Sequence, residues 1–223
     1  KKIKNQQGLT KLYQDAFTDN WDLPAFSDYE GVSYTYGQSA QLIFKVHSFL
    51  NSEGIEKGDK VALLGRNSSN WAVTFIAIIS YGAVAVPILP DFNPADVEQI
   101  LEHSESKILF GVEQLVEKID IDSLKKIKTI VNLTNFSILH DGSEGTGAKS
   151  LEKSFDNNET ITKKNEFKLP ELYNEDLVVI SYTSGTSGFT KGVMIPVRSL
   201  YSNIVFAREH MPLKAADKIV SFL

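Results

Sequence analysis

The sequence predicts an α/β fold in which a mostly parallel sheet is flanked by helices. Short apolar segments of strand length alternate with longer segments whose apolar residues recur at helical spacing, the pattern of βαβ units. Residues 177–180 form a continuous apolar run, which suits a strand covered on both faces of a parallel sheet. The 223 residues, 42% of them hydrophobic and 23% charged, suffice for one large domain or two small ones.

The N-terminal part of the sequence predicts one helix before a small hairpin and a second helix after it. The first helix carries an apolar stripe made by Leu9, Leu12, Tyr13, Ala16 and Phe17. Residues 32–36 are rich in β-forming side chains and follow Gly31, which indicates a strand. A second helix repeats apolar residues from 42 to 50 and ends near Gly54.

The middle of the chain alternates strands with helices. One helix is expected after Asn70, with Trp71 on its apolar face, and another begins at Asn93-Pro94, a favourable cap followed by proline at the first helical position. A further helical stretch is expected before residue 128. The expected strands are residues 60–65, 83–89, 107–111 and 128–133.

Residues 141–171 differ from the rest because they are mostly polar. We expect them to form a long, exposed and partly mobile excursion. After it, the sequence predicts a strand from residue 177, a second strand from Lys191, a helix over 199–210 and the beginning of a strand at 217–223.

Composition and spacing argue against several kinds of function. The net charge of −5 disfavours nucleic-acid binding, which usually requires a basic face. No cysteine is present, so disulfides, thiolate metal sites and cysteine nucleophiles are excluded. The four histidines show no metal-ligand spacing, and we expect each at the surface or at a helix end.

Nothing in the sequence indicates export or a membrane span. The most apolar stretch, residues 75–89, has 15 residues and is interrupted by Gly82 and Pro87, whereas a membrane helix needs ~20. No apolar segment follows the basic N-terminus as it would in a signal peptide. We expect a cytoplasmic protein without a transmembrane segment, and leave open peripheral contact with a membrane.

The candidate functional site is the loop YTSGTSGFTKG at Tyr182–Gly192. Its glycines let backbone N–H groups approach a ligand closely, its hydroxyls are hydrogen-bond donors, and its lysine adds a positive charge. Such convergent donors suit a polyphosphate, and phosphate sites of α/β folds lie beyond the carboxyl ends of strands. The candidate binding residues are Thr183, Ser184, Gly185, Thr186, Ser187, Gly188 and Lys191.

Two other interpretations compete for glycine-rich segments. A Walker A loop is excluded at Lys191, because Gly192 and strand-like residues follow it instead of Ser or Thr and a helix. A polar surface turn would explain a short GTSG alone, but the buried strand before it and the lysine after it favour phosphate binding. Residues Gly142–Ser150 nearly match Walker A, yet Ala148 breaks the spacing, and we expect a flexible surface loop there.

The loop resembles the phosphate-binding loop of the adenylate-forming superfamily, which comprises acyl-CoA synthetases, peptide-synthetase adenylation domains and luciferases. The usual form is (Y/F)TSGT(T/S)GxPKGV, with Thr190 here in place of proline. Three upstream segments resemble the family in the same order: VSYTYGQSA, GIEKGDKVALLGRNSSNW and GAVAVPILPDFNPADVEQILEHSESKILF. The last of these, with the final SFL, is most similar to long-chain fatty acid–CoA ligases. Pro196 and Val197 depart from the Ser/Thr-His of many members, which puts substrate contacts there in doubt.

The resemblance implies that residues 1–223 are an incomplete N-terminal large domain of the acyl-CoA synthetase-like fold, with the C-terminal domain absent. It implies ATP, Mg²⁺ and the co-substrate CoA, a fatty acid converted to acyl-AMP and then acyl-CoA, and phosphate binding at residues 183–191 with Lys191 as the catalytic candidate. No metal ligand is assigned here, because the family's Mg²⁺-binding Glu and catalytic C-terminal Lys would lie beyond Leu223. The fragment alone is therefore expected to be inactive.

Other functions stay open at this point. An amino- or aryl-acid adenylation domain shares the phosphate loop, and a non-catalytic nucleotide-binding module would need no more than that loop. A structural or interaction protein fits least, because it would not need an apolar strand that leads into a donor-rich loop. Arg66 and Asn67, just beyond the strand at 60–65, are further candidates for contacts near a ligand.

Overall fold

The structure, a computed structural model, describes residues 8–142, 146–156, 161–183, 191–212, 214 and 217–221. The strands are β1 (Pro24–Ser27), β2 (Ser33–Thr35), β3 (Lys60–Leu64), β4 (Val84–Ile88), β5 (Ile108–Gly111), β6 (Thr129–Asn132), β7 (Ile138–Asp141), β8 (Leu177–Thr183) and β9 (Lys191–Pro196). The helices are α1 (Leu9–Asp19), α2 (Tyr36–Ser52), α3 (Ser69–Tyr81), α4 (Pro94–Ser104), α5 (Glu113–Val116), α6 (Thr146–Asp156) and α7 (Val197–His210), with 3-10 turns η1 (Ile121–Ser123) and η2 (Lys164–Glu166).

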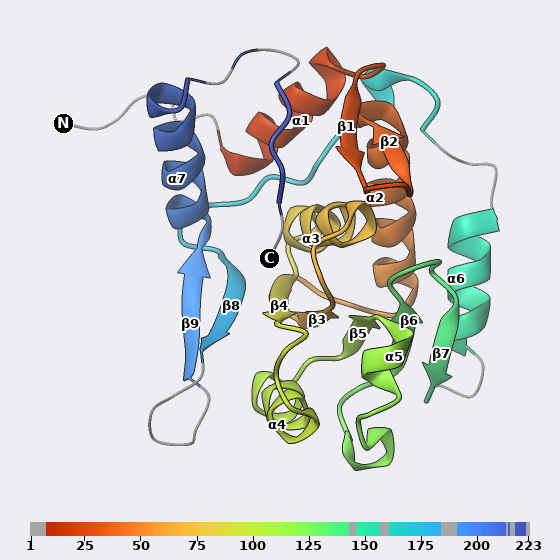
Figure 1. Ribbon diagram of the computed structural model, residues 1–223. Coiled ribbons are helices and arrows are strands. Elements are labelled where there is room, and N and C mark those ends of the chain that lie inside the picture. Colours follow the sequence, from red (N-terminus) through yellow and green to blue (C-terminus); the bar gives the residue numbers. More distant parts are fainter. Residues whose placement is uncertain are drawn as a thin grey trace.

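Seven strands form the main sheet in the order β7-β6-β5-β3-β4-β8-β9 (Figure 1). The inner strands β6, β5, β3, β4 and β8 run parallel, and an antiparallel strand lies at each edge. Every residue of β5 and β6 is buried, including the polar Thr129 and Asn132 at the ends of β6. The predicted α/β fold with a mostly parallel sheet is confirmed.

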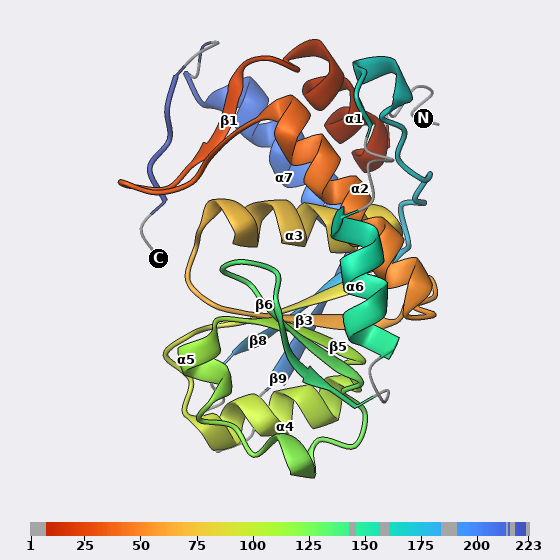
Figure 2. The same cartoon turned by 90° about the vertical axis from the view of Figure 1, so that its right-hand side faces the viewer.

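Helices cover both faces of this sheet (Figure 2). Helices α2 and α3 lie on one face with α1 and α7 outside them, while α4 and α5 lie on the other. Each face has its own apolar cluster: Phe49, Ile78 and Phe110 belong to the first, and Leu64, Ile100 and Leu109 to the second. Successive residues of one strand therefore point into different clusters. No described helix combines the length and the apolar character that crossing a bilayer requires.

Local signals explain where the helices begin. Helix α2 starts with a capping box between Thr35 and Gln38. Asn93 caps α4 by accepting a hydrogen bond from the Asp96 backbone at 2.9 Å, as predicted. Helix α3 begins earlier than predicted, because Ser68 and not Asn70 is its cap.

The segment 141–171 is more ordered than predicted. Within it α6 forms and packs against α2 (Figure 2), where Lys45 donates a hydrogen bond to the Phe155 carbonyl at 2.8 Å. Its apolar residues Leu151, Ile161 and Phe167 are buried, so the expectation of an exposed excursion is wrong for them. Of the glycine-rich Gly142–Ser150, the part from Thr146 is helical rather than a loop, and residues 143–145 and 157–160 lie outside the described residues.

Two further predictions concern the C-terminal part. Helix α7 is present and begins slightly before the predicted residue 199. Residues 217–221 form no strand, in contrast to the prediction, and Ile219 and Val220 are largely exposed. Ser221 instead accepts a hydrogen bond from the Asn67 side chain at 2.8 Å, which places this segment beside the carboxyl end of β3.

Candidate functional site

The predicted phosphate loop extends from an antiparallel hairpin. Strand β8 ends at Thr183 and β9 begins at Lys191, and these two residues lie opposite each other in the register. One step earlier Tyr182 lies opposite Gly192. The predicted loop residues Ser184, Gly185, Thr186, Ser187 and Gly188 lie outside the described residues. The structure therefore places the two ends of the loop side by side.

Both described ends of the loop face solvent. Thr183 and Lys191 are exposed, and within the described part of the chain Lys191 forms no ion pair. Its ammonium group is thus free to interact with a phosphate oxygen, and the Thr183 hydroxyl lies on the opposite strand. A cation and a hydroxyl are therefore held at one loop stem.

The stem is built by close packing across the hairpin. Tyr182 and Ile180 are buried on β8, and both lie against Gly192. A Cβ atom at residue 192 would come within 2.9 Å of the Ile180 side chain and 3.2 Å of the Tyr182 ring. Glycine at this position is therefore required by the close approach of the two strands.

The hairpin lies at the edge of the sheet where α/β proteins bind ligands. Strands β4 and β8 are parallel, with Ala85 opposite Val179, so their carboxyl ends point the same way. Ligands of such sheets bind beyond the carboxyl ends, particularly where neighbouring strands send their connections to opposite faces. Here β3 leads to α3 on one face and β4 leads to α4 on the other.

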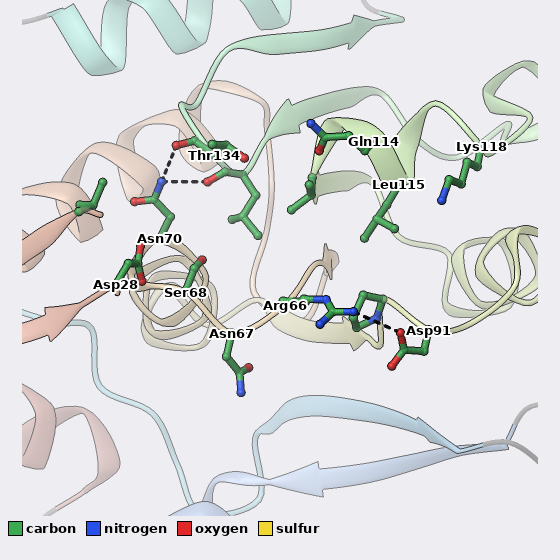
Figure 3. Close-up of a pocket in the computed structure, with 14 residues that line it drawn as sticks. Asp28, Arg66, Asn67, Ser68, Asn70, Asp91, Gln114, Leu115, Lys118 and Thr134 are labelled. Carbon is green, nitrogen blue, oxygen red and sulfur yellow. Dashed lines mark hydrogen bonds and ion pairs between the residues drawn. The ribbon is translucent and has the colours of Figure 1, made fainter. Parts of the chain in front are cut away.

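A cavity of about 530 Å³ occupies this switch point (Figure 3). Its walls come from the turns after β3, β4, β5 and β6, from α5 and from the β1–β2 hairpin. The volume falls within the range of small-molecule pockets, roughly 300–1,000 Å³. Its polar lining includes Asp28, Arg66, Asn67, Asn70, Gln114 and Lys118.

Asn70 fixes one wall of this cavity. Its side-chain amide donates to the carbonyl oxygens of Leu133 and Thr134, at 2.9 and 2.8 Å, as Figure 3 shows. Its own carbonyl oxygen accepts from the Tyr34 hydroxyl at 2.8 Å. Burial, followed by the negative charge of Asp28, raises the pKa of Tyr34, so the phenol stays protonated and able to donate.

Asp28 ties the small hairpin to the start of α3. Its carboxylate accepts hydrogen bonds from the backbone N–H and the hydroxyl of Ser69, at 2.7 and 3.0 Å. A negative charge at a helix N-terminus is favourable because it meets unpaired N–H groups. The hairpin is thereby held over the cavity.

Arg66 and Asn67, flagged from the sequence, both line the cavity. The Arg66 guanidinium lies 3.8 Å from the Asp91 carboxylate, and both side chains are largely exposed (Figure 3). An exposed pair of this kind contributes little to stability. Arg66 and Lys118 therefore bring positive charge to the cavity, and among the described residues neither forms a buried ion pair.

The histidines and Trp71 only partly match expectation. His47 is not a surface residue, since it lies between α2 and α3 and its Nε2 contacts the Ala77 carbonyl at 2.9 Å. Burial lowers its pKa to about 4, although that backbone contact acts in the opposite direction. Trp71 is partly buried and stacks on Phe75 with ring centres 5.3 Å apart. His103 and His210 lie in the last turns of helices, as predicted.

Metal binding finds no support among the described side chains, which include no group of three or more His, Asp or Glu residues able to hold an ion. We therefore assign no Mg²⁺ ligand within this part of the chain.

Sequence reasoning missed Asp28, Asn70 and Lys118 as components of the site. The sequence predicts a helix that begins after Asn70. Ser68 is an equally suitable capping residue, and a helix that begins after Ser68 has Asn70 in its first turn. The contacts of Asp28 join residues 41 positions apart, and no local pattern indicates them. Lys118 follows α5. This helix reaches the cavity because β5 pairs with β3, and the pairing of strands cannot be deduced from the local sequence.

Comparisons with known proteins agree with this architecture. The family described as AMP-binding enzyme matches residues 13–223. Long chain acyl-CoA synthetase 3 of Arabidopsis thaliana is 26% identical over 168 residues, which make up 74% of this chain and 25% of that protein. Surfactin synthase subunit 2 of Bacillus subtilis is 27% identical over 220 residues, which make up 99% of this chain and 6% of that protein.

A solved structure shows the same fold. The inhibitor-bound N-terminal domain of FACL13 from Mycobacterium tuberculosis has a TM-score of 0.73 and 24% identity, over 95% of this chain and 50% of that one. This chain thus spans about a quarter of the acyl-CoA synthetase that it matches and half of this domain.

Proposed function

Since this chain belongs to the AMP-binding enzyme family, we propose that the whole protein is an ATP-dependent fatty acid–CoA ligase, and that this chain supplies its polyphosphate-binding loop. In the proposed reaction a carboxylate oxygen attacks the α-phosphorus of ATP and pyrophosphate leaves. The sulfur of CoA then attacks the acyl carbon and AMP leaves. The long-chain class of acid is supported by the similarity to the Arabidopsis synthetase.

The observation that carries the proposal is the hairpin stem. It holds Thr183 opposite Lys191 at the carboxyl edge of the sheet, on either side of a Gly-, Ser- and Thr-rich loop. A polyphosphate carries several strong acceptor oxygens, and donors that are fixed before it binds stabilise it without reorganisation.

Each end of the loop has a proposed role. The Lys191 ammonium would neutralise charge on the β- and γ-phosphates, and the Thr183 hydroxyl would donate a hydrogen bond. Both would orient the triphosphate so that the α-phosphorus faces the attacking carboxylate. This chain's contribution would then be positioning and charge stabilisation. Mg²⁺ would assist by neutralising phosphate charge, but no described residue is assigned to hold it.

The cavity supports a second contact with substrate. It lies at the same edge of the sheet and presents Arg66, Asn67 and Lys118. We propose that it receives part of a substrate other than the triphosphate.

A second candidate function is adenylation of an amino or aryl acid for transfer to a carrier protein. The match to surfactin synthase subunit 2, which extends over 99% of this chain, favours it. The two candidates share the loop and differ in the acid and in the thiol that accepts the acyl group.

Acid-dependent ATP–pyrophosphate exchange by the complete protein tests the proposal. We expect exchange with fatty acids and, after addition of CoA, formation of a thioester. Exchange with amino or aryl acids alone would favour the second candidate. If none of these acids supported exchange while the protein bound ATP, both ligase functions would be wrong.

A further inference from the structure

We propose that His103 is a positioning residue for the phosphate loop, acting through its hydrogen bond to Tyr182 at the stem. The inference rests on the proposed function of that loop and adds a residue from a different element, α4.

The contact joins α4 directly to the base of the hairpin. The Nδ1 atom of His103 lies 2.7 Å from the Tyr182 hydroxyl, and the two rings meet edge-to-face with centres 5.8 Å apart. His103 lies in the last turn of α4, and Tyr182 immediately precedes Thr183. A helix outside the hairpin thus fixes the residue from which the loop departs.

Tyr182 is placed to pass this restraint to both strands. Its ring is buried and packs on Gly192 of β9, the residue after Lys191. Movement of the ring would therefore shift β9 as well as β8. Fixing the phenol fixes the relative position of Thr183 and Lys191, which are opposite each other in the register.

The contribution of His103 differs from ordinary core packing. Its side chain is exposed on the outer surface of α4, while Tyr182 packs among Ile100, Leu101 and Ile180 in the second apolar cluster. Within the described part of the chain, the Tyr182 hydroxyl is its hydrogen-bond partner. Burial raises the pKa of Tyr182, which keeps the phenol protonated for this bond. Removing the His103 ring should thus release the stem while leaving the core filled.

The test uses the complete protein and four variants: His103→Ala, Tyr182→Phe, the double variant, and His103→Asn, whose amide can occupy the place of Nδ1. Controls are Tyr29→Phe and His210→Ala, which make the same chemical changes at exposed sites. The measurements are hydrogen–deuterium exchange of peptides covering 182–192, the Kd for MgATP, and the KM for ATP and kcat of pyrophosphate exchange.

We expect His103→Ala and Tyr182→Phe each to weaken ATP binding and raise the KM for ATP by roughly two- to tenfold, the effect of one lost hydrogen bond. The double variant should resemble the single ones, because either change breaks the same bond. Exchange of amide hydrogens should accelerate at 182–192 and not in β3 or β5, and His103→Asn should recover most of the wild-type values.

Two results would overturn the inference. One is unchanged deuterium exchange at 182–192 and unchanged Kd for MgATP in His103→Ala. The other is additive losses in the double variant with a lowered Tm and no change in the KM for ATP, which would indicate two independent structural roles. If wild-type protein bound ATP but catalysed no exchange with any acid, the proposed function would fail. The deuterium-exchange and Kd measurements would still decide whether His103 positions the loop.

Discussion

The centre of the sheet and the β8–β9 hairpin differ in how much of each strand is covered. All residues of β5 and β6 are buried, because parallel strands in the middle of the sheet have helices on both faces. The first four residues of β9 are exposed, and Val193 and Met194 have 52% and 69% of their surface accessible. The centre therefore holds the buried apolar side chains, whereas Lys191, one of the predicted ligand contacts, belongs to a strand whose first four residues are exposed.

Substitutions in the two regions should therefore have different effects. Central residues make apolar contacts on two faces, so a lost side chain leaves a cavity. The side chains of Thr183 and Lys191 at the end of the hairpin are exposed and present donors to solvent, so their loss should affect ligand binding more than folding. The following predictions test that division, from the largest expected effect to the smallest.

Phe110→Ala should cost about 3–5 kcal/mol of the free energy of unfolding. The ring is fully buried in β5 and meets Phe49 edge-to-face with centres 6.2 Å apart. Urea unfolding followed by circular dichroism measures the loss. A loss below about 1 kcal/mol would mean that the centre tolerates a cavity, and the contrast with the hairpin would disappear.

Lys191→Ala in the complete protein should slow ATP–pyrophosphate exchange about 100-fold, the usual cost of removing one preorganised donor, with an unchanged Tm. Lys153→Ala, an exposed lysine on α6, is the matched control and should leave exchange as it is. Normal exchange by a well-folded Lys191→Ala variant would remove this residue from its proposed role.

Acid should destabilise the packing of α2 against α3, where His47 is buried. His47 has a pKa of about 4 when folded and 6.5 when unfolded, so below pH 6.5 the unfolded chain binds a proton that the folded chain does not. Stability should therefore fall between pH 6.5 and 4 by up to ~1.4 kcal/mol per pH unit, and this loss should level off below pH 4.

His47→Gln should flatten that part of the stability curve, whereas His210→Gln, at an exposed helix end, should not. Stability measured by urea unfolding at several pH values distinguishes the two variants.

The carboxylates Asp59 and Asp176 affect stability in a different pH range. Burial, the largest single effect, opposes their ionisation. The hydrogen bonds and charges of Lys107 and Lys57 respectively, together with a backbone hydrogen bond to each carboxylate, outweigh it and lower the pKa of both, so their contribution is lost only in stronger acid.

Met194→Ala should change the free energy of unfolding of this chain by no more than about 0.5 kcal/mol, as is usual for exposed side chains. It removes an apolar side chain on β9 and is the hairpin counterpart of Phe110→Ala. A loss of 2 kcal/mol or more in urea unfolding would show that β9 is packed as tightly as the centre.

The sequence predicted the centre of the sheet well because each strand there is determined by local apolar runs. The cap at Asn93 was found for the same reason, since its partner Asp96 is three residues away. Helix α6 was missed because its mostly polar sequence gains burial through contact with β7 and with α2, and α2 is distant in the chain. The wall built by Asn70 also could not be predicted, since its partners are 36, 63 and 64 residues away.

The candidate site was predicted by a resemblance more than by local structure. The two ends of the loop, Thr183 and Lys191, come together as the predicted strands require. The predicted binding residues between them lie outside the described residues, so their role stays a proposal. The cavity depends on how four strands and a hairpin assemble, which spacing along the chain does not determine.

The divergence of α3 and α4 to opposite faces of the sheet has a consequence for redesign. It leaves the cavity lined mainly by turns, with contributions from α3 and α5, rather than by the strands themselves, and turns accept changes of length and sequence more readily than strands do. A library of variants confined to these turns could therefore change which molecules fit the cavity while leaving the hydrogen-bonded ladder of the sheet untouched.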